Sequence, residues 1–320
     1  MEKWVVTGSA GYIGSHISRT LLERGIMVVG VDNFSSGLIS NLHPAMEFHN
    51  LDIRDSESLE NIFRNATGVI HSAGYKFAAL SVNEPEEAFA NNLEGTESVV
   101  AAMKKVGCQN IIFSSSCAVY GTPTHLPVTE SSSLSPETPY AESKLLAEEA
   151  IRSSGINYIS LRFFNVVGSG IDNIEDQSKH NLFPIILDAW QNNQIARITG
   201  KNFPTPDGTA IRDYIHVDDI VSAHIKSMEH FNSKPEVGNV YNLSLGEGVS
   251  VLQVMENFKE MLGRSFNFDY MGMREGDPSC IYGSALLAQS QLHWKPKKNL
   301  KDMVESAISA RRTKLKIKSV

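Results

Sequence analysis

Residues 1–16, MEKWVVTGSAGYIGSH, place three glycines, Gly8, Gly11 and Gly14, between an apolar run and a helical pattern. Each glycine costs backbone entropy on folding, so the turn must gain something from the missing side chains. The first N–H groups of a helix and the positive end of its dipole form an anion site. Glycine lets a pyrophosphate approach that backbone, and the third glycine lets the helix pack closely on the strand. The stretch therefore predicts a phosphate-binding strand–turn–helix unit.

Asp32 indicates that the ligand of this turn is a dinucleotide. The spacing G-x-x-G-x-x-G departs from the commonest fingerprint, G-x-G-x-x-G, so the turn alone is weak support. Asp32 ends the apolar run MVVGVD, 18 residues after Gly14, near the roughly 20 expected for an acid that binds the adenosine ribose. A carboxylate there favours NAD over NADP, because it would repel a 2′-phosphate. The alternative, a turn residue after a strand, leaves the turn and helix together unexplained.

The composition favours a globular protein without nucleic-acid or membrane partners. The chain has 320 residues, 42% hydrophobic and 20% charged, and a net charge of −7. An acidic protein lacks the basic surface that binds nucleic acid, and no apolar run approaches the roughly 18 residues that span a bilayer. We expect no signal peptide from the start MEKW. Cys108, Cys117 and Cys280 match neither a disulfide framework nor a metal site, so we expect no metal and a cytoplasmic setting.

The first half of the chain alternates strand and helix patterns. Ile13, Ile17 and Leu21 recur at intervals of four and mark one face of a helix. Such alternation predicts a parallel sheet covered by helices on both faces. The predicted strands are Trp4–Thr7, Met27–Val31, Met46–Asn50, Val69–Ser72, Asn110–Ser115 and Tyr158–Phe164, and the predicted helices include Gly11–Arg24, Ser56–Asn65, Pro85–Val106 and Pro139–Ser154.

After Asn165 the pattern changes and predicts a smaller second lobe. GSGIDNIEDQSKH and TGKNFPTPDGTAIRD are long irregular stretches. Two later segments, YIHVDDIVSAHIKSM and VYNLSL, predict a helix and a strand that return to the first lobe. We therefore assign residues 1–164 and 214–246 to an NAD-binding domain, and residues 165–213 and 247–320 to a substrate-binding domain.

Tyr140 and Lys144 are the candidates for acid–base chemistry. The stretch YAESK places them four residues apart, on one face of a predicted helix. A phenol with a pKa of about 10 is a poor base at neutral pH, but a nearby ammonium or a positive nicotinamide lowers that pKa. Ser116 follows the strand Asn110–Ser115, at the edge where parallel sheets bind ligands. Its hydroxyl is expected to bond to the group that Tyr140 deprotonates, although backbone capping accounts equally well for at least one serine of SSS.

These motifs together resemble the extended short-chain dehydrogenase/reductase family. In the first half the motifs are TGSAGYIGSH, VDN, DIRD, HSAG, NNLEGT, SSSCAVYG and YAESK. In the second half LRFFNVVG, NLFPII, PTPDGTAIRDYIHVDD and REGDP are similar to the UDP-glucose 4-epimerases of that family. The resemblance covers essentially the whole chain. It implies an α/β fold, a doubly wound parallel Rossmann sheet with a smaller mixed α/β substrate-binding lobe.

The resemblance also implies roles for particular residues. Ser116, Tyr140 and Lys144 would be the catalytic residues. The NAD site would comprise Gly8, Gly11, Tyr12, Ile13, Gly14, Asp32, Asn33, Asp52, Ile53, Ala73, Gly74, Lys76, Asn91, Tyr140 and Lys144. The UDP-sugar site would comprise Lys76, Ser116, Asn165, Asn181, Leu182, Arg212, Tyr214, Arg274 and Asp277. Arg212 and Arg274 also suit a diphosphate on physical grounds, with surface pairing to Asp213 and Asp277 as the alternative.

The implied reaction is a redox-neutral isomerisation with NAD as cofactor. A hydride leaves C4 of the sugar while Tyr140 takes the hydroxyl proton, the 4-keto sugar rotates about its link to the diphosphate, and the hydride returns to the opposite face. UDP-galactose and UDP-glucose are interconverted in this way. The resemblance further implies a homodimer, in which the apolar faces of Pro85–Val106 and Ala141–Ile151 either form an intersubunit helix bundle or pack on their own sheet.

Three other functions are weighed against this one. A 4,6-dehydratase needs an Asp–Glu pair where this chain has Cys117 and Ala118. An epimerase of N-acetylated or uronate UDP-sugars would use the same catalytic residues. Ser72, Ala118 and Val166 depart from the family pattern and leave the sugar open, whereas a bulky Ile281 at the position that often admits N-acetyl groups favours UDP-glucose and UDP-galactose. A non-catalytic NAD-binding scaffold would be expected to lose Tyr140 or Lys144.

Overall fold

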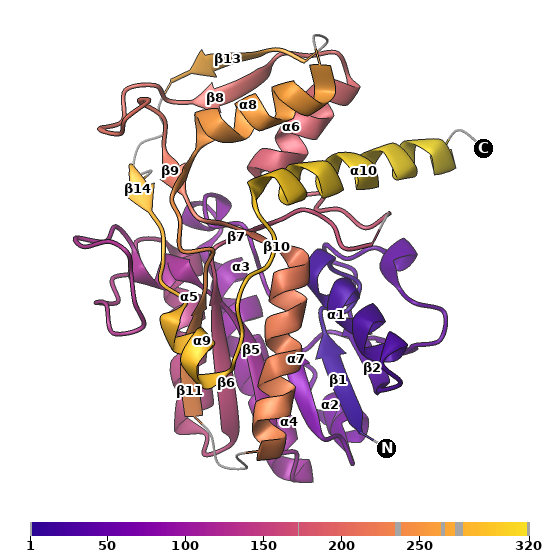
Figure 1. The fold of residues 1–320 in the computed structure, drawn as a ribbon. Coiled ribbons are helices and arrows are strands. Elements are labelled where there is room, and N and C mark those ends of the chain that lie inside the picture. The colour runs from indigo at the N-terminus through magenta and orange to yellow at the C-terminus, as the bar shows by residue number, and fades with distance from the viewer. Residues whose placement is uncertain (1, 172, 234–237, 264–265, 273–277, 319–320) are drawn as a thin grey trace.

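A parallel sheet of seven strands forms the larger lobe of the computed structural model, which describes residues 2–171, 173–233, 238–263, 266–272 and 278–318 (Figure 1). The strand order is β11-β6-β5-β4-β1-β2-β3, and every neighbouring pair is parallel. The order reverses at β1, so the carboxyl ends of β1 and β4 flank a ligand crevice. The strands are β1 (Lys3–Thr7), β2 (Met27–Asp32), β3 (Glu47–Asn50), β4 (Gly68–His71), β5 (Asn110–Ser116), β6 (Asn157–Phe163) and β11 (Gly238–Leu243). The predicted doubly wound sheet is confirmed.

Alternating side chains of the strands divide the core between the two faces of the sheet. Trp4 and Val6 pack with helices α1 (Tyr12–Glu23) and α7 (Val217–Ser233) on one face. Val5 packs on the other face with α2 (Ser56–Phe63), α4 (Gly95–Val106) and α5 (Pro139–Ser153). The apolar sides of α4 and α5 thus cover their own sheet, which is one of the two arrangements expected for them. This alternation follows from the two-residue period of a strand.

The helix predicted over Pro85–Val106 is interrupted. It consists of α3 (Pro85–Phe89), a π-helical turn (Ala90–Glu94) and α4. A π-helical turn inserts an extra residue and rotates the side chains that follow it. Asn92 in this turn is consequently buried, with 1% of its surface exposed.

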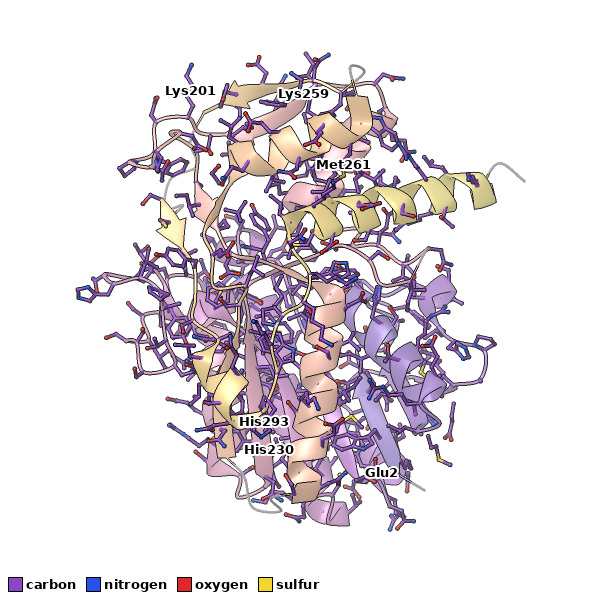
Figure 2. The ribbon with its side chains drawn as sticks, in the orientation of Figure 1. Glu2, Lys201, His230, Lys259, Met261 and His293 are labelled. Carbon is purple, nitrogen blue, oxygen red and sulfur yellow. The ribbon has the colours of Figure 1, made fainter. Side chains whose placement is uncertain are left out.

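The second lobe has its own apolar core at the opposite end of the molecule from the sheet (Figure 1). Helices α6 (Leu182–Gln191), α8 (Val251–Leu262) and α10 (Leu300–Lys318) surround it together with the parallel pair β8 (Ala196–Thr199) and β13 (Phe268–Met271). A small sheet orders β12 (Val249–Ser250), β9 (Ile211–Arg212) and β14 (Cys280–Ile281). In Figure 2, Lys201, Lys259 and Met261 mark this lobe, and Glu2, His230 and His293 mark the far end of the other.

Two segments near the lobe boundary differ from the sequence prediction. The segment 214–228 was expected to be helical throughout, but Tyr214–His216 forms β10, which pairs with β7 (Asn165–Val167) before α7 begins. Helix α9 (Leu286–Gln291) and Trp294 lie in a stretch assigned to the substrate lobe, yet they pack in the core of the first lobe. The Trp294 indole donates to the Asp219 carbonyl on α7 at 2.9 Å, which holds the segment there.

Candidate active site

The glycine turn packs as tightly as its sequence suggests. Gly8 has φ +72°, and a Cβ on it would lie 2.7 Å from the Ala73 amide nitrogen. A Cβ on Gly14 would lie 2.1 Å from the Gly8 carbonyl oxygen, whereas one on Gly11 would meet only that oxygen, at 3.1 Å. Gly11 is the N-cap of α1 and has no side chain to cover the first-turn N–H groups. Gly8 and Gly14 therefore close the turn, and Gly11 leaves its anion site open.

Exchanging these glycines for alanine separates the two roles. Gly14→Ala is expected to lower the free energy of unfolding by roughly 2–3 kcal/mol, because the new methyl group collides with rigid backbone. Gly11→Ala is expected to keep the stability and to lower the NAD content of the purified protein. Urea unfolding and released NAD measure the two effects. Equal stability of both variants would contradict this division.

Asp32 joins the glycine turn to the end of β2. One carboxylate oxygen accepts the Ala10 N–H at 3.0 Å and the other accepts the Phe34 N–H at 2.8 Å. Burial raises the pKa of Asp32, and these backbone hydrogen bonds partly offset that rise. A carboxylate can accept about four hydrogen bonds, so Asp32 keeps capacity for a ribose hydroxyl besides the backbone N–H groups.

The predicted residues after β2 and β3 form a polar group at the adjoining edge. Asp52 accepts from Arg54 at 2.7 Å and from the Asn33 amide at 3.1 Å. The Arg54 hydrogen bonds are the main reason that the pKa of Asp52 falls to about 2. Ile53 next to it is buried in the core.

Ser116 and Tyr140 meet at the carboxyl end of β5. Ser116 is the last residue of β5, and Tyr140 lies in the first turn of α5, where Thr138 caps the helix through the Ala141 N–H. Burial raises the pKa of Tyr140 to about 12, and a hydrogen bond between its side chain and Ser116 lowers it. The protein alone therefore keeps the phenol protonated at neutral pH. The expected pair is brought together by the fold.

Lys144 lies one turn further along α5 and is buried, with 6% exposed. Its Nζ donates to the Ser114 carbonyl at 3.0 Å and lies 4.9 Å from the centre of the Phe113 ring. Burial lowers the pKa of Lys144 to about 8, and the charge of Glu148 raises it. Lys144 is thus fixed on the end of β5 rather than extended into solvent.

Asn92 is a candidate that the sequence reasoning missed. Its side-chain nitrogen donates to the Ser143 hydroxyl at 2.9 Å, while its Oδ1 has no partner among the described residues. A Cβ on Gly74 would lie 2.5 Å from this oxygen and 3.4 Å from Lys144 Nζ. The predicted residue, Asn91, instead donates back to Glu87 in its own helix at 2.8 Å. The only hint in the sequence was that NNLEGT has two adjacent asparagines, because the π-helical turn has no recognisable pattern.

A buried ion pair lies next to the candidate catalytic residues. Glu148 accepts from two nitrogens of Arg162, at 3.0 and 2.6 Å, and from the Ser115 hydroxyl. Arg162 also donates to the Tyr120 hydroxyl at 2.9 Å. Ser114, Ser115 and Ser116 are thus each joined to α5, through Lys144, Glu148 and Tyr140 respectively. The sequence reasoning did not identify this network.

The predicted substrate residues are distributed over both lobes. Asn181 donates to Asp176 at 2.6 Å, and Lys76 lies 3.9 Å from the other oxygen of Asp176. Asn165 donates to the Asp213 carbonyl at 3.0 Å, and Arg212 to the Ile211 carbonyl at 2.9 Å. Leu182 and Tyr214 belong to the second apolar core, where Tyr214 is 3% exposed. Arg274 and Asp277 lie outside the described residues.

This chemistry fits a dinucleotide. The turn around Gly11 leaves room for a pyrophosphate, the Asp32 carboxylate ends β2, and the Asn92 oxygen is left unpaired beside Gly74 and Lys144. The described residues contain no group of three or more His, Cys, Asp or Glu placed to hold a metal ion. None of their helices is long and apolar enough to cross a membrane.

The sequence pattern of the NAD dependent epimerase/dehydratase family matches residues 4–244. The chain belongs to this family. NAD is therefore its cofactor. UDP-glucose 4-epimerase 2 of Arabidopsis thaliana is 36% identical to this chain, and the alignment covers 93% of this chain and 92% of the relative.

Two solved structures of UDP-glucose 4-epimerases share the fold of this family member. The one from Stenotrophomonas maltophila, with bound NAD and formylated UDP-arabinopyranose, has a TM-score of 0.94 at 31% identity, over 99% of this chain and 100% of its own. The one from Bifidobacterium longum, in complex with NAD⁺ and UDP, has a TM-score of 0.89 at 32% identity, over 97% and 98%. The resemblance inferred from the sequence motifs is confirmed.

Proposed function

We propose that this chain is an isomerase that interconverts UDP-glucose and UDP-galactose. The observation that carries the proposal is the convergence of Ser116, Tyr140 and Lys144 at the carboxyl end of β5. Family membership and the names of the relatives support it. A 4,6-dehydratase is disfavoured because Cys117 is a thiol whose pKa burial raises to about 12, so it serves poorly as an acid or base.

The side chains divide the work between binding and proton transfer. NAD, when bound, supplies the hydride acceptor and donor for C4 of the sugar and a positive charge. Tyr140 takes the proton of the 4-hydroxyl and later returns it. Ser116, already bonded to Tyr140, holds the 4-oxygen. Lys144 supplies a second positive charge from a fixed position on the Ser114 carbonyl, which favours the phenolate form of Tyr140.

The second lobe holds the UDP part while the sugar turns. Asn165 lies in β7 and Arg212 in β9, and the Asp176–Asn181 pair belongs to the segment that follows β7. Arg212 carries the charge that suits a diphosphate. Arg274 and Asp277 complete the proposed UDP-binding set. Anchoring UDP at one end allows the sugar to present either face at C4.

Ile281 supports glucose and galactose as the sugars. It is 7% exposed in β14 and packs with Val119, Tyr120 and Phe164 beside Cys117. Cys117, Val119 and Tyr120 come directly after Ser116 in the chain, so Ile281 packs beside the turn that follows Ser116, where a bulky side chain would restrict the volume available to an N-acetyl group. N-acetylated and uronate UDP-sugars remain the alternative substrates.

A coupled assay without added NAD tests the proposal. Purified protein is incubated with UDP-galactose and removed, and UDP-glucose is then measured with UDP-glucose dehydrogenase and its own NAD. UDP-glucose is the expected product, formed with NAD retained from expression. Activity that appears only with added NAD would indicate a loosely held cofactor. No turnover of UDP-galactose even with added NAD, together with turnover of N-acetylated or uronate UDP-sugars, would assign one of those sugars as the substrate instead. No turnover at all would favour the non-catalytic scaffold.

We also propose a cytoplasmic homodimer. Cys108, Cys117 and Cys280 are free thiols, which supports a reducing compartment. The homodimer rests on the family resemblance, because the apolar sides of α4 and α5 are used within the chain. A mass in solution equal to one chain, 35.2 kDa, would contradict it.

A further inference from the structure

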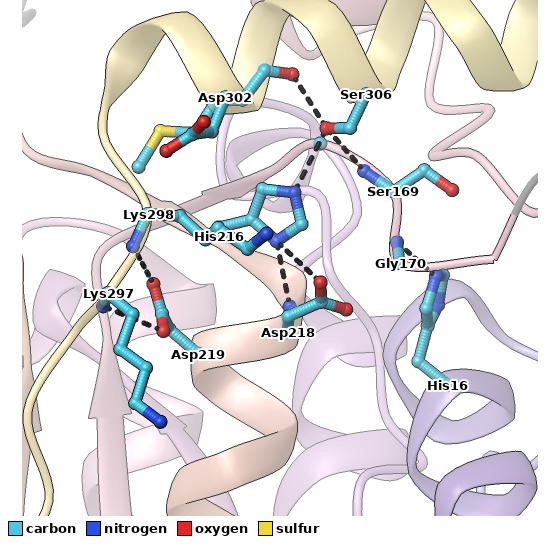
Figure 3. A network of polar contacts seen from close by, with 12 residues as sticks. His16, Ser169, Gly170, His216, Asp218, Asp219, Lys297, Lys298, Asp302 and Ser306 are labelled. Atoms are coloured by element: carbon cyan, nitrogen blue, oxygen red, sulfur yellow. Dashed lines mark hydrogen bonds and ion pairs between the residues drawn. The ribbon is translucent and has the colours of Figure 1, made fainter.

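Three consecutive backbone groups after β7 are held by side chains from distant helices. They are the Gly168 carbonyl, the Ser169 N–H and the Gly170 N–H. Figure 3 shows His16 beside Gly170, and Ser306 of α10 beside Ser169. The segment of residues 168–170 leads into the stretch that carries Asp176 and Asn181.

The contacts from α1 come from the helix that begins at the nucleotide turn. The Tyr12 hydroxyl donates to the Gly168 carbonyl at 2.7 Å, and the Gly170 N–H donates to His16 Nε2 at 3.2 Å. His16 Nδ1 lies 2.8 Å from the Tyr12 carbonyl, which only accepts, so Nδ1 carries the proton and Nε2 is free to accept. The two rings meet edge to face at 5.3 Å. Burial lowers the pKa of His16 to about 4, so this tautomer persists at neutral pH.

The opposite side of the segment is equally constrained. His216 Nδ1 accepts the Asp218 N–H at 3.0 Å, so its Nε2 donates to the Ser306 hydroxyl at 2.9 Å. Ser306 in turn accepts the Ser169 N–H at 3.2 Å. A Cβ on Gly168 would lie 2.6 Å from the His216 ring, and one on Gly170 would lie 1.7 Å from an Asp218 oxygen. The segment therefore has little freedom to relocate.

These contacts extend to the proposed UDP site through short links. The Ser169 hydroxyl bonds to the carbonyl of Ile174 at 2.6 Å. Glu175 pairs with the buried Arg311 of α10 at 2.8 Å. Asp176 is the next residue in the chain, and its carboxylate accepts a hydrogen bond from the Asn181 side chain. The backbone that presents Asp176 is thus fixed from α1 at one end and from α10 at the other.

We infer that Tyr12 and His16 are positioning residues for the UDP-sugar. They hold the 168–170 backbone, and through it the Asp176–Asn181 pair, against the first turn of the cofactor helix. This inference rests on the proposed function and adds two side chains of the NAD-binding helix to the control of substrate affinity. The phenol of Tyr12 contacts the backbone of residues 168–170, whereas its own backbone lies in the first turn of α1, next to Gly11.

The test measures UDP binding to the NAD-loaded protein by calorimetry. Tyr12→Phe and His16→Phe remove the two contacts and keep the rings. The matched controls are Tyr241→Phe, whose buried hydroxyl donates to Gln291 on α9 at 3.0 Å, and His224→Phe. His224 is buried on α7 and bonds to the carbonyl four residues earlier at 2.9 Å, as His16 does. Its Nε2 has no partner among the described residues.

We expect each of Tyr12→Phe and His16→Phe to raise the Kd for UDP roughly three- to ten-fold, the loss of one hydrogen bond. KM should rise with it, and the rise in KM should exceed any fall in kcat. The controls should shift the unfolding temperature by similar amounts and leave the Kd for UDP unchanged.

Unchanged Kd values in Tyr12→Phe and His16→Phe, equal changes in the controls, or loss of NAD alone would overturn the inference. Absence of UDP binding by the unmodified protein would overturn the proposed function as well. Tyr12→Phe alone decides the matter should His16→Phe not accumulate.

Discussion

Tyr140→Phe is expected to lower kcat about 1,000-fold, in the middle of the range for loss of a general base. Phenylalanine keeps the ring in the first turn of α5 and removes only the hydroxyl that bonds to Ser116. NAD content and the Kd for UDP should change little, because the glycine turn and the second lobe are untouched. Turnover at saturating UDP-galactose measures the effect.

The matched control for this prediction is Tyr241→Phe. Tyr241 is also a buried tyrosine, but it lies in the edge strand β11 and its hydroxyl contacts Gln291 on α9. It should retain near-normal turnover. Near-normal turnover in Tyr140→Phe would refute its assignment as the base. A loss of NAD from Tyr140→Phe would instead indicate that the phenol mainly holds the cofactor.

Glu148→Ala is expected to lower the free energy of unfolding by about 3–5 kcal/mol, the cost of leaving a buried charge without its partner. Arg162 is 4% exposed and would keep its charge next to Tyr120. Replacing both charges, as in Glu148→Leu with Arg162→Met, should recover most of the loss, because the isolated charge is then gone. Urea unfolding measures all three proteins. A double variant less stable than Glu148→Ala would contradict this account.

Glu148→Gln is expected to change the pH dependence of kcat. The Glu148 charge raises the pKa of Lys144, which burial has lowered to about 8. Without that charge the pKa falls further, so more of Lys144 is neutral at pH 7.5. Because charged Lys144 is proposed to favour the Tyr140 phenolate, the alkaline decline of kcat should begin at a lower pH than in the unmodified protein. An unchanged pH profile would show that Glu148 acts on stability alone.

Local patterns determined the sheet and the nucleotide turn. The strand alternation, the helical period of Ile13, Ile17 and Leu21, and the glycines depend on neighbours within a few residues. They predicted β1, α1 and β2 to within two residues of the observed ends. The four-residue spacing of Tyr140 and Lys144 was likewise a property of one helix. Ser116 could be placed because parallel strands end at a common edge.

Tertiary structure alone decided the contacts between distant residues. Tyr12 meets Gly168 across 156 residues, and His16 meets Gly170 across 154. The π-helical turn that buries Asn92 and the packing of Trp294 in the first lobe also have no local pattern. The periodicity of a sequence indicates which face of a helix or strand is apolar. It does not indicate which buried polar groups form hydrogen bonds with each other. The sequence therefore determines the elements, whereas the buried hydrogen bonds that fix the site arise only when elements far apart in the chain pack together, within the first lobe and between the lobes.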